Sequence, residues 1–519
     1  MLATGATFWK DPDGVAYVTI PRGGRTERYR VRSAAFRSVV RAIYAEACPR
    51  ITDDGEARPG SIADKAMTEA LPSLEAMVLR PGTETRVPGL RSILADDGRT
   101  LWVDLGRDDW ALVRVTRDGW EIVPGADVPL VRADAVRALP IPSRNDAAGA
   151  LAELQRLLNL RPDQRDEFCL LVSWLVACLW PCGPYPILAI DGEQGSGKST
   201  ASRMLRKLVD PNKSPLRAPP KTEADLIVAA AAGRIVAIDN VSHLDPDMAD
   251  TLCRLSTGAG LSRRRLYTDD DEHLVEVCRP VLLNGINSVL SRGDIADRAL
   301  VIGLPRIPDE RRVQEADLQR DFDKAAPGIL AALLNALSEA LHYDTGLERL
   351  ALPRMADFAA LACRASRGLG WGPEAVLGAM ERNRHAAVEA VVDSDPMSDA
   401  LRDVLKREGV EGLDGEGEWR GTASALLPLL TAAVSDDVRR ERSWPKDATR
   451  LSGRLRRLAP ALHRIGLEVT LPETGGRAGR EIVIRQRSER SQRSTQSGTR
   501  GNGNAEYGAS VPAAFPKRE

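Results

Sequence analysis

The first 140 residues carry short apolar runs rich in β-branched side chains, separated by turn-forming residues. Such runs predict strands, because alternate side chains of a strand pack on one face. We expect strands at 15–20, 27–31, 100–105, 111–115 and 120–123, with a hairpin turn at Asp118-Gly119. Helices are predicted at 34–47 and 61–71, the second ended by Pro72. Residues 1–140 are therefore predicted as a β-rich domain, to which no recognisable chemistry assigns an activity.

The pattern changes after the proline-rich stretch 139–143. Strand-like and helix-like runs alternate from 145 to 305, as in a parallel α/β sheet. The expected strands are 185–190, 234–238, 280–283 and 299–303. A helical pattern follows over 306–395 and is clearest at 325–341. We therefore predict an α/β domain at 145–305 and a helical domain at 306–395.

A charged, glycine-rich linker at 407–418 interrupts a last domain, predicted at 396–485. Helices are expected at 419–430 and 447–465, although Pro460 leaves open that the second is two helices. Its apolar stripe consists of Leu451, Leu455, Leu458, Leu462 and Ile465. Strands at 467–471 and 481–485 can pair around Gly475-Gly476, which suggests a winged helix. The tail, 486–519, has almost no apolar spacing and is predicted to be disordered.

Composition narrows the class of protein. The 519 residues have a net charge of −1, so any DNA contact must come from local basic patches. The seven cysteines are scattered, which disfavours a disulfide framework and fits a reducing cytoplasm. No signal peptide is expected, and the apolar run 168–180 is too short for a membrane span. We expect a cytoplasmic protein without a membrane partner.

The strongest motif is a complete G-x-x-x-x-G-K-[ST] pattern between a predicted strand and a predicted helix. Its glycines let successive backbone N–H groups face phosphate oxygens, and the helix N-terminus adds its dipole. Lys198 is expected to bridge the β- and γ-phosphates of ATP, and Ser199 to ligate Mg²⁺. The residues expected to bind nucleotide are Gly192, Glu193, Gln194, Gly195, Ser196, Gly197, Lys198, Ser199 and Thr200.

Besides its serine, a phosphate-binding loop needs an acidic residue that binds the metal ion, at the end of a neighbouring strand. Asp239, directly after four apolar residues, is the candidate, against the alternative of a simple turn aspartate. Asn240 follows where many ATPases carry a glutamate that polarises water. An amide cannot take a proton, but it can orient water, so hydrolysis remains open.

Two further catalytic candidates lie on the following strands. Asn284 ends the strand 280–283 and could sense the γ-phosphate, with Asn287 as second choice; alternatively it only turns the chain before Gly285. Arg298, with Arg292 as another candidate, could reach a neighbouring subunit's nucleotide and offset charge in the transition state. Both arginines could equally be salt-bridge partners of nearby aspartates.

The order and spacing of these motifs, together with Gly258-Ala259-Gly260, resemble the superfamily 3 helicase-like AAA+ ATPases of phages and integrated elements, including primase-helicases. The resemblance covers about 165–305 and implies a hexameric ring, DNA replication and a DNA-gripping hairpin at 257–269. The gripping residues would be Arg263, Arg264, Arg265 and Tyr267. Asn240 departs from the acidic pair of most such helicases, which questions unwinding more than ATP binding.

A second basic patch lies at 439–464, with nine arginines or lysines against two acids. Arg454, Arg456 and Arg457 are its DNA-binding candidates; the alternative is a helix that packs on the ATPase. Two functions remain: an ATP-driven DNA helicase or translocase, and an ATP-switched DNA-bound regulator or loader with slow turnover.

Overall fold

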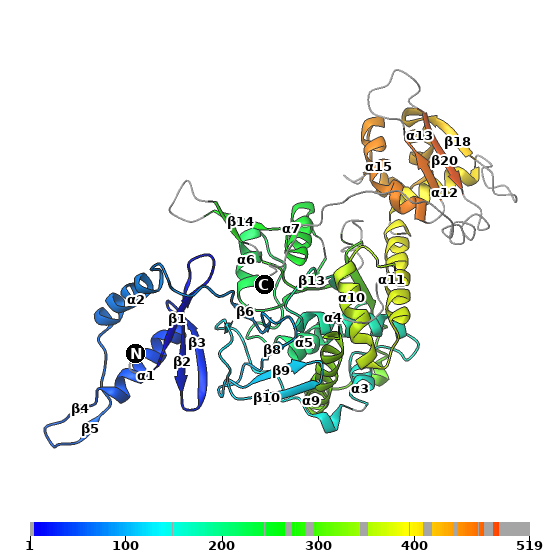
Figure 1. Ribbon diagram of the computed structural model, residues 1–519. Helices are drawn as coiled ribbons and strands as arrows, with labels where there is room; N and C mark the ends of the chain where they lie inside the picture. Colours follow the sequence, from blue (N-terminus) through cyan, green and yellow to red (C-terminus); the bar gives the residue numbers. More distant parts are fainter. Residues whose placement is uncertain are drawn as a thin grey trace, which may run out of the picture. The chain divides into compact units, whose positions relative to one another are not determined.

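The computed structural model divides into two compact units, Met1–Ala387 and Val388–Glu519 (Figure 1). It describes residues 5–147, 149–242, 244–264, 272–275, 277–285, 295, 297–342, 351–393, 395–407, 418–440, 444–464, 467–471 and 481–486. Each unit encloses hydrophobic clusters of its own.

The chain begins with a small antiparallel sheet of order β1-β2-β3. Val18 and Ile20 of its middle strand pack with Phe36 and Leu71 of two covering helices. The elements are β1 (Thr7–Lys10), β2 (Ala16–Arg22), β3 (Arg25–Arg30), α1 (Ala34–Ala47), the pair β4 (Arg50–Ile51) and β5 (Ala57–Arg58), and α2 (Asp64–Val78). The strands expected here are present within two residues, and α1 has the predicted bounds.

The predicted end of α2 at Pro72 is wrong, because the helix continues to Val78. A proline inside a helix removes one backbone hydrogen bond and crowds the preceding turn. Leu74 and Val78, beyond the proline, pack on the same cluster as Leu71. Their burial offsets the lost bond, so tertiary packing overrides the local signal.

A second antiparallel sheet, of order β10-β9-β8-β7, packs on the helices that follow it. Val103 and Val115 share one cluster with those helices, and the Trp120 indole N–H donates to Asn335 Oδ1 at 2.9 Å. The expected boundary at 139–145 therefore falls inside a shared core. The elements are β6 (Gly89–Leu90), β7 (Ser92–Leu94), β8 (Leu101–Asp104), β9 (Leu112–Thr116), β10 (Gly119–Val123), β11 (Leu130–Val131) and η2 (Arg144–Asp146).

A four-stranded parallel sheet of order β13-β16-β12-β17 forms the centre of this unit. Alternate side chains of each strand enter two different clusters, as expected of a parallel sheet covered on both faces. The strands are β12 (Ile187–Asp191), β13 (Val236–Val241), β16 (Val281–Gly285) and β17 (Ala299–Gly303), and they confirm the predicted parallel α/β fold. A separate antiparallel pair is formed by β14 (Leu261–Arg264) and β15 (Glu272–Val275).

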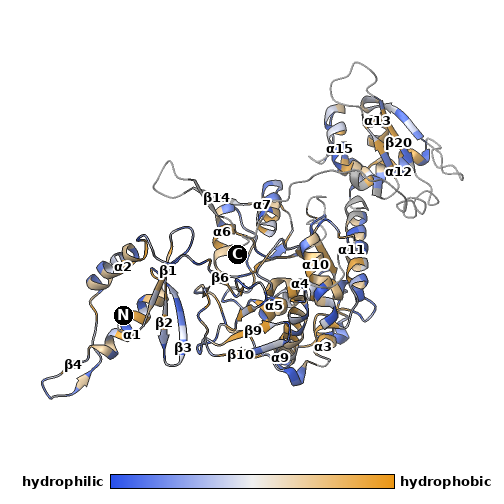
Figure 2. Ribbon diagram, in the orientation of Figure 1, coloured by the Kyte–Doolittle hydropathy of each residue, from blue (hydrophilic) through white to orange (hydrophobic). Residues whose placement is uncertain are grey.

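Helices cover both faces of the parallel sheet. Residues of α3 (Ala150–Leu157), α4 (Arg165–Leu179), α5 (Lys198–Val209) and α9 (Glu315–Ala340) join the cluster on one face. Residues of α6 (Glu223–Ala231) and α7 (Pro246–Thr257) join the other. From Phe168 to Leu179 every residue of α4 is buried, and α4 and α10 are among the more apolar helices (Figure 2). None of the described helices is long and apolar enough to cross a membrane.

The helices after the sheet extend the same core. The helix expected at 325–341 begins ten residues earlier, at Glu315, and continues through Pro327. The remaining elements are η3 (Asp309–Arg311), α10 (Ala356–Ser366), η5 (Arg367–Leu369) and α11 (Pro373–Asp393).

The second unit combines helices with an antiparallel sheet of order β18-β20-β19. The helix expected at 419–430 is partly wrong: 418–422 form a strand, and the Thr422 hydroxyl caps a helix from Ala423. The cause is non-local, since Trp419 lies opposite Ile484. The elements are α12 (Pro396–Arg407), β18 (Glu418–Thr422), α13 (Ala423–Ala433), α14 (Asp436–Arg440), α15 (Ala448–Arg464), β19 (Leu467–Thr470) and β20 (Glu481–Gln486).

The long helix α15 is one continuous helix despite Pro460, which settles that alternative. Its leucine stripe packs in the unit's core: Leu451, Leu455 and Leu462 are buried and Leu458 is partly buried. Ile465 and the turn at 475–476 lie outside the described residues, as does the tail from 487, whereas Gln486 ends β20.

Candidate functional site

The loop between β12 and α5 is shaped by three glycines. Gly192, Gly195 and Gly197 have φ values of 146°, 85° and 84°, a range that L side chains rarely adopt. A Cβ on Gly192 would lie 2.5 Å from the carbonyl oxygen of Leu304. The backbone of the loop can therefore keep these φ values, and pass this close to Leu304, only with glycine at these positions.

The donors of this loop suit a phosphate. Lys198 Nζ donates to the carbonyl oxygens of Gly192 and Glu193 at 2.6 and 2.9 Å, which uses two of its three N–H groups. Ser196 Oγ is buried and has no hydrogen-bond partner within the described residues. Gly197 supplies no side-chain cap to α5, and the first turn carries no acid. An ammonium, an unpaired hydroxyl and uncapped helix N–H groups form an anion-binding donor set.

The two predicted magnesium ligands meet at the carboxyl edge of the sheet. Ser199 Oγ donates to Asp239 Oδ1 at 2.8 Å, although the two residues come from different elements, α5 and β13. Asp239 is partly buried, and its backbone N–H donates to the Arg217 carbonyl oxygen at 2.8 Å. A hydroxyl and a carboxylate in contact are a fitting pair of oxygen ligands for Mg²⁺.

Asn240 and Asn284 are also brought together there. Asn240 is exposed with φ 55°, at an irregularity in the pairing of β13 with β16. Its N–H donates to Asn284 Oδ1 at 2.8 Å, and Asn284 Nδ2 donates to Ser202 Oγ at 2.9 Å. Asn284 is only 2% exposed, so its amide ties β13 to α5. This geometry suits a residue that positions Asn240 better than one that contacts phosphate itself.

Arg298 lies at the opposite edge of the sheet. Its carbonyl oxygen accepts from the N–H of Ile187, the first residue of β12, whereas the glycine-rich loop follows the last. Four residues of strand separate the two edges by about 13 Å, more than an extended arginine side chain spans. Arg298 therefore cannot serve the nucleotide site of its own chain.

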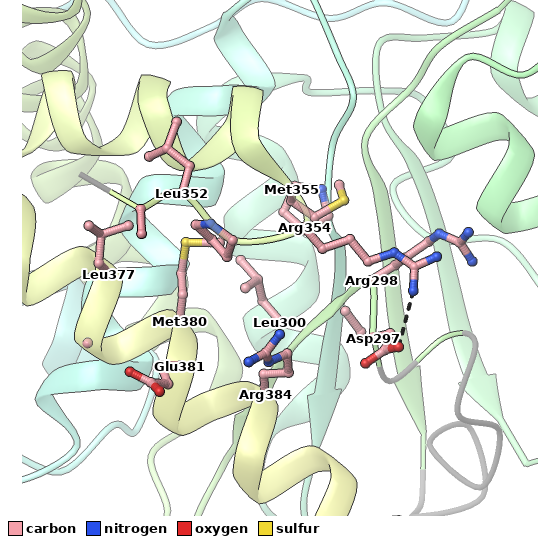
Figure 3. A pocket seen from close by; sticks show the side chains of 15 residues that line it. Asp297, Arg298, Leu300, Leu352, Arg354, Met355, Leu377, Met380, Glu381 and Arg384 are labelled. Carbon is pink, nitrogen blue, oxygen red and sulfur yellow. Dashed lines mark hydrogen bonds and ion pairs between the residues drawn. The ribbon is translucent and has the colours of Figure 1, made fainter. Parts of the chain in front are cut away.

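A pocket of about 340 Å³ adjoins Arg298 (Figure 3). Arg298 lies at the end opposite Leu352 and Leu377. Arg354 Nη1 contacts Asp297 Oδ2 at 3.1 Å, which holds the segment before β17 against the start of α10. Asp297, which the sequence suggested as a partner of Arg298, thus pairs with Arg354; Arg292 and Asn287 lie outside the described residues.

The DNA-binding candidates fall into two groups. Arg263 and Arg264 lie in β14, opposite His273 and Glu272 of β15, while Arg265 and Tyr267 lie outside the described residues. On α15, Arg456 and Arg457 are exposed, whereas Arg454 is ion-paired with Asp395 at 2.7 Å. Arg457 Nε donates to the Gly453 carbonyl oxygen at 3.3 Å, but neither Arg456 nor Arg457 has an ion pair with a residue that the structure describes.

Two residues near the site were not predicted from the sequence. Ser202 holds Asn284, and its spacing of four from Lys198, to whose carbonyl it donates at 2.8 Å, placed it on the same face of α5. Arg354 braces Asp297, but nothing in the sequence links positions 57 residues apart. Thr200 lies in the first turn of α5, where its hydroxyl accepts from Arg203 at 3.3 Å.

Comparison with known structures finds weak likenesses. Two apo structures of the NrS-1 C-terminal region share 14% identity, with TM-scores of 0.38 and 0.39; each match covers 94% of this chain and 98% or 97% of the solved one. A structure of JCV helicase bound to an acetamide compound shares 10% identity over 44% of this chain and 67% of its own, with a TM-score of 0.25. Comparison with curated proteins found no match.

Family models match two regions in chain order. Residues 151–377 match the actinomycete integrative conjugative element replication protein, and 398–498 match the C-terminal domain of the same protein. The first region contains the glycine-rich loop, Asp239, Asn284 and Arg298, and the second contains α15. Each match covers less than half of the chain, and over these two regions the chain is similar to the replication proteins of actinomycete integrative conjugative elements.

Proposed function

We propose that this chain is a replication protein that works as a ring-forming, Mg²⁺-dependent ATPase, moving along or unwinding DNA as a hexamer of identical chains. The observation that carries the ATPase part is the 2.8 Å contact between Ser199 Oγ and Asp239 Oδ1. Without an acid placed to bind the metal, nothing would bring the serine hydroxyl of the loop into contact with a carboxylate of a neighbouring strand. The proposal includes a P-loop AAA+-like core and a winged-helix-like second unit.

Each residue of the loop has a separate task in this proposal. Lys198 neutralises charge on the β- and γ-phosphates, and the N–H groups at the start of α5 hold the phosphate oxygens. Ser199 and Asp239 would hold Mg²⁺, which would supply positive charge to offset that of the phosphates. Asn284, fixed through Ser202, keeps Asn240 oriented toward the attacking water.

The ring follows from the position of Arg298. Because it lies about 13 Å along the strands from its own loop, it can offset transition-state charge only at the site of another copy. A subunit would then supply Lys198 to one interface and Arg298 to the next. Head-to-tail contacts of this kind form a ring when the rotation from one copy to the next closes, which the proposed hexamer requires.

DNA contact is proposed at two places. The antiparallel β14–β15 pair, with Arg263, Arg264, Arg265 and Tyr267, would grip a strand in the ring's channel. In the second unit, the order helix, strand, three helices and β-hairpin, with Arg456 and Arg457 exposed on α15, supports a duplex-binding winged helix.

The test of the proposed function combines turnover, assembly and strand displacement. We expect ATP hydrolysis that single-stranded DNA stimulates, a ring-sized species when ATP is present, and displacement of a labelled strand from a forked duplex. Hydrolysis and assembly without displacement would leave a translocase or loader. ATP hydrolysis that is absent with and without DNA would contradict the proposal.

One observation favours the alternative, an ATP-switched regulator or loader. Asn240 stands where a catalytic glutamate is expected and, as an amide, takes no proton. Asn240→Glu is therefore expected to keep or raise ATP turnover, measured at saturating ATP with and without DNA. The matched control is Asn240→Ala, which should lower it. A well-folded but inactive Asn240→Glu variant would show that the amide itself is required.

The two basic patches are expected to differ in their dependence on salt and nucleotide. Arg456→Ala/Arg457→Ala should weaken duplex binding without ATP and flatten the slope of log affinity against log salt by up to about 2, near one per lost phosphate contact. Arg263→Ala/Arg264→Ala/Arg265→Ala should instead remove DNA stimulation of ATPase and leave nucleotide-free binding intact.

Arg454→Ala separates DNA binding from stability. Its partner Asp395 lies 2.7 Å away in the same unit, so this change should lower the melting temperature more than the salt slope. If the Arg456/Arg457 variant changes neither affinity nor slope, these arginines line a protein interface and the second unit serves assembly.

A further inference from the structure

A cluster of buried charged residues lies at the amino edge of the parallel sheet, away from the glycine-rich loop. Asp210 is fully buried and is contacted by Arg91 at 3.4 Å and Arg206 at 3.7 Å. Arg234 and Arg279 lie close by, at the starts of β13 and β16. Asp210 thus pairs with two arginines and has two more nearby that it does not contact, in a place where unbalanced charge is costly.

Arg234 and Arg279 are held only by neutral acceptors. Arg234 Nε and Nη2 donate to the carbonyl oxygens of Cys178 and Trp180, and Nη2 also to the Tyr185 hydroxyl. Arg279 Nε and Nη1 donate to the carbonyl oxygens of Ala230 and Cys278. Neither forms an ion pair with any described residue, and each keeps one amino group, Nη1 of Arg234 and Nη2 of Arg279, for another partner.

The pKa of Arg279 is consistent with an excess of positive charge at this place. Burial, followed by the nearby charge of Arg234, lowers the pKa of Arg279 to about 10. Asp210 raises it, but that carboxylate is already shared by Arg91 and Arg206. The Arg279 guanidinium remains charged at neutral pH, so an added anion would lower the free energy of the site.

Both arginines line one pocket of about 730 Å³. Its lining also includes three acids, Glu84, Asp96 and Asp127, of which Glu84 and Asp127 share Arg86, so the positive charge of the pocket is confined to Arg234 and Arg279. The walls include the partly exposed indole of Trp102 beside apolar side chains of β6 and β7. Ser92 Oγ, which is buried and has no partner among the described residues, is a further polar atom of the lining.

We propose that this pocket binds a nucleoside phosphate unit, either free or within a single DNA strand, with its phosphate at Arg234 and Arg279 and its base against Trp102. Guanidinium groups pair with phosphate oxygens, and aromatic faces stack on bases of any sequence. The site is separate from the glycine-rich loop and stands whether or not that loop hydrolyses ATP.

Wild-type protein tests the pocket without mutation. Cys182 is exposed and lines it, while Cys48 is exposed elsewhere and serves as the internal control. Alkylation of Cys182 by iodoacetamide, followed by mass spectrometry, should slow severalfold with oligothymidylate or AMP, and Cys48 should not change. Protection by AMP alone identifies a free nucleotide as the source; protection by the oligonucleotide alone identifies a strand. Unchanged Cys182 labelling with both would overturn the proposal.

Variants of the pocket separate the contribution of charge to binding from that of stacking. Binding is measured by fluorescence anisotropy of a labelled oligothymidylate, or by calorimetry with AMP in the Lys198→Ala background. Arg279→Gln keeps an amide donor and should weaken binding roughly tenfold, and on the strand reduce the salt slope by about 0.7. Trp102→Ala should weaken binding about fivefold or more with the slope unchanged. The exposed, remote Arg117→Gln has the same charge change and should bind like wild type.

A purely structural role makes different predictions. If Arg279 only holds carbonyl groups at the end of α6, Arg279→Gln would lower thermal stability without altering affinity or salt slope. Wild-type affinity in folded Arg279→Gln and Trp102→Ala, or equal loss in Arg117→Gln, would overturn the proposal. If a variant fails to fold, the Cys182 protection result decides.

Discussion

Lys198→Ala is expected to lower ATP turnover by about 10²–10³-fold or more and to weaken nucleotide binding. The change removes the ammonium group that faces the phosphates in the proposed site. The fold holds this charge in place before the reaction, and water that fills the vacated space cannot stabilise the phosphates equally well. Turnover would be measured at saturating ATP and Mg²⁺, and binding with a fluorescent ATP analogue. Asp239→Ala should reduce turnover similarly, because Ser199 then loses its partner for the metal.

Lys207 offers a matched control for this prediction. It lies on the same helix, α5, and its Nζ contacts Asp323 Oδ1 at 2.6 Å on the surface. Lys207→Ala removes the same charge and should leave turnover close to wild type. Near-normal hydrolysis by Lys198→Ala would refute the assignment of the nucleotide site, whatever the control shows.

Arg298→Ala is expected to leave ATP binding intact and to reduce hydrolysis by about 10³-fold or more, the usual effect of losing an arginine that acts in trans. If Arg298 acts on a nucleotide, it must act on that of a second copy, since Arg298 and the loop lie at opposite edges of the sheet. Mixing Arg298→Ala with Lys198→Ala protein should therefore restore part of the activity. Some interfaces of a mixed ring join an intact Lys198 to an intact Arg298.

The control for Arg298 comes from the same pocket. Arg384→Ala removes another lining arginine, contributed by α11, and should retain most of the turnover. Absence of any recovery on mixing, with both variants shown to assemble together by sizing, would mean that Arg298 does not complete a neighbour's site. The arginine would then be a structural residue beside the Asp297–Arg354 pair.

Local pattern was sufficient for most elements of the fold. The parallel strands, the buried helix α4 and the leucine stripe of α15 follow from runs and spacings along a few residues. Errors occur where distant contacts overrule such signals. Pro72 remains inside α2 because Val78 is buried, and 418–422 become a strand because Ile484 lies opposite Trp419.

The sequence by itself predicted the chemistry proposed for the glycine-rich loop, since the motif specifies which atoms would meet a phosphate and where glycine is needed. It also indicated Asp239, because acids that end neighbouring parallel strands gather at one edge. Only the tertiary structure decided the rest. It placed Arg298 beyond the reach of its own site, occupied the amide of Asn284 between β13 and α5, and paired Arg454 with Asp395. It also gathered Arg91, Arg206, Arg234 and Arg279 around Asp210. The physical reason is the distance along the chain over which each signal acts. The spacing of apolar and polar residues reflects one helical turn or one strand, whereas side-chain partners come from segments that meet only when the chain folds.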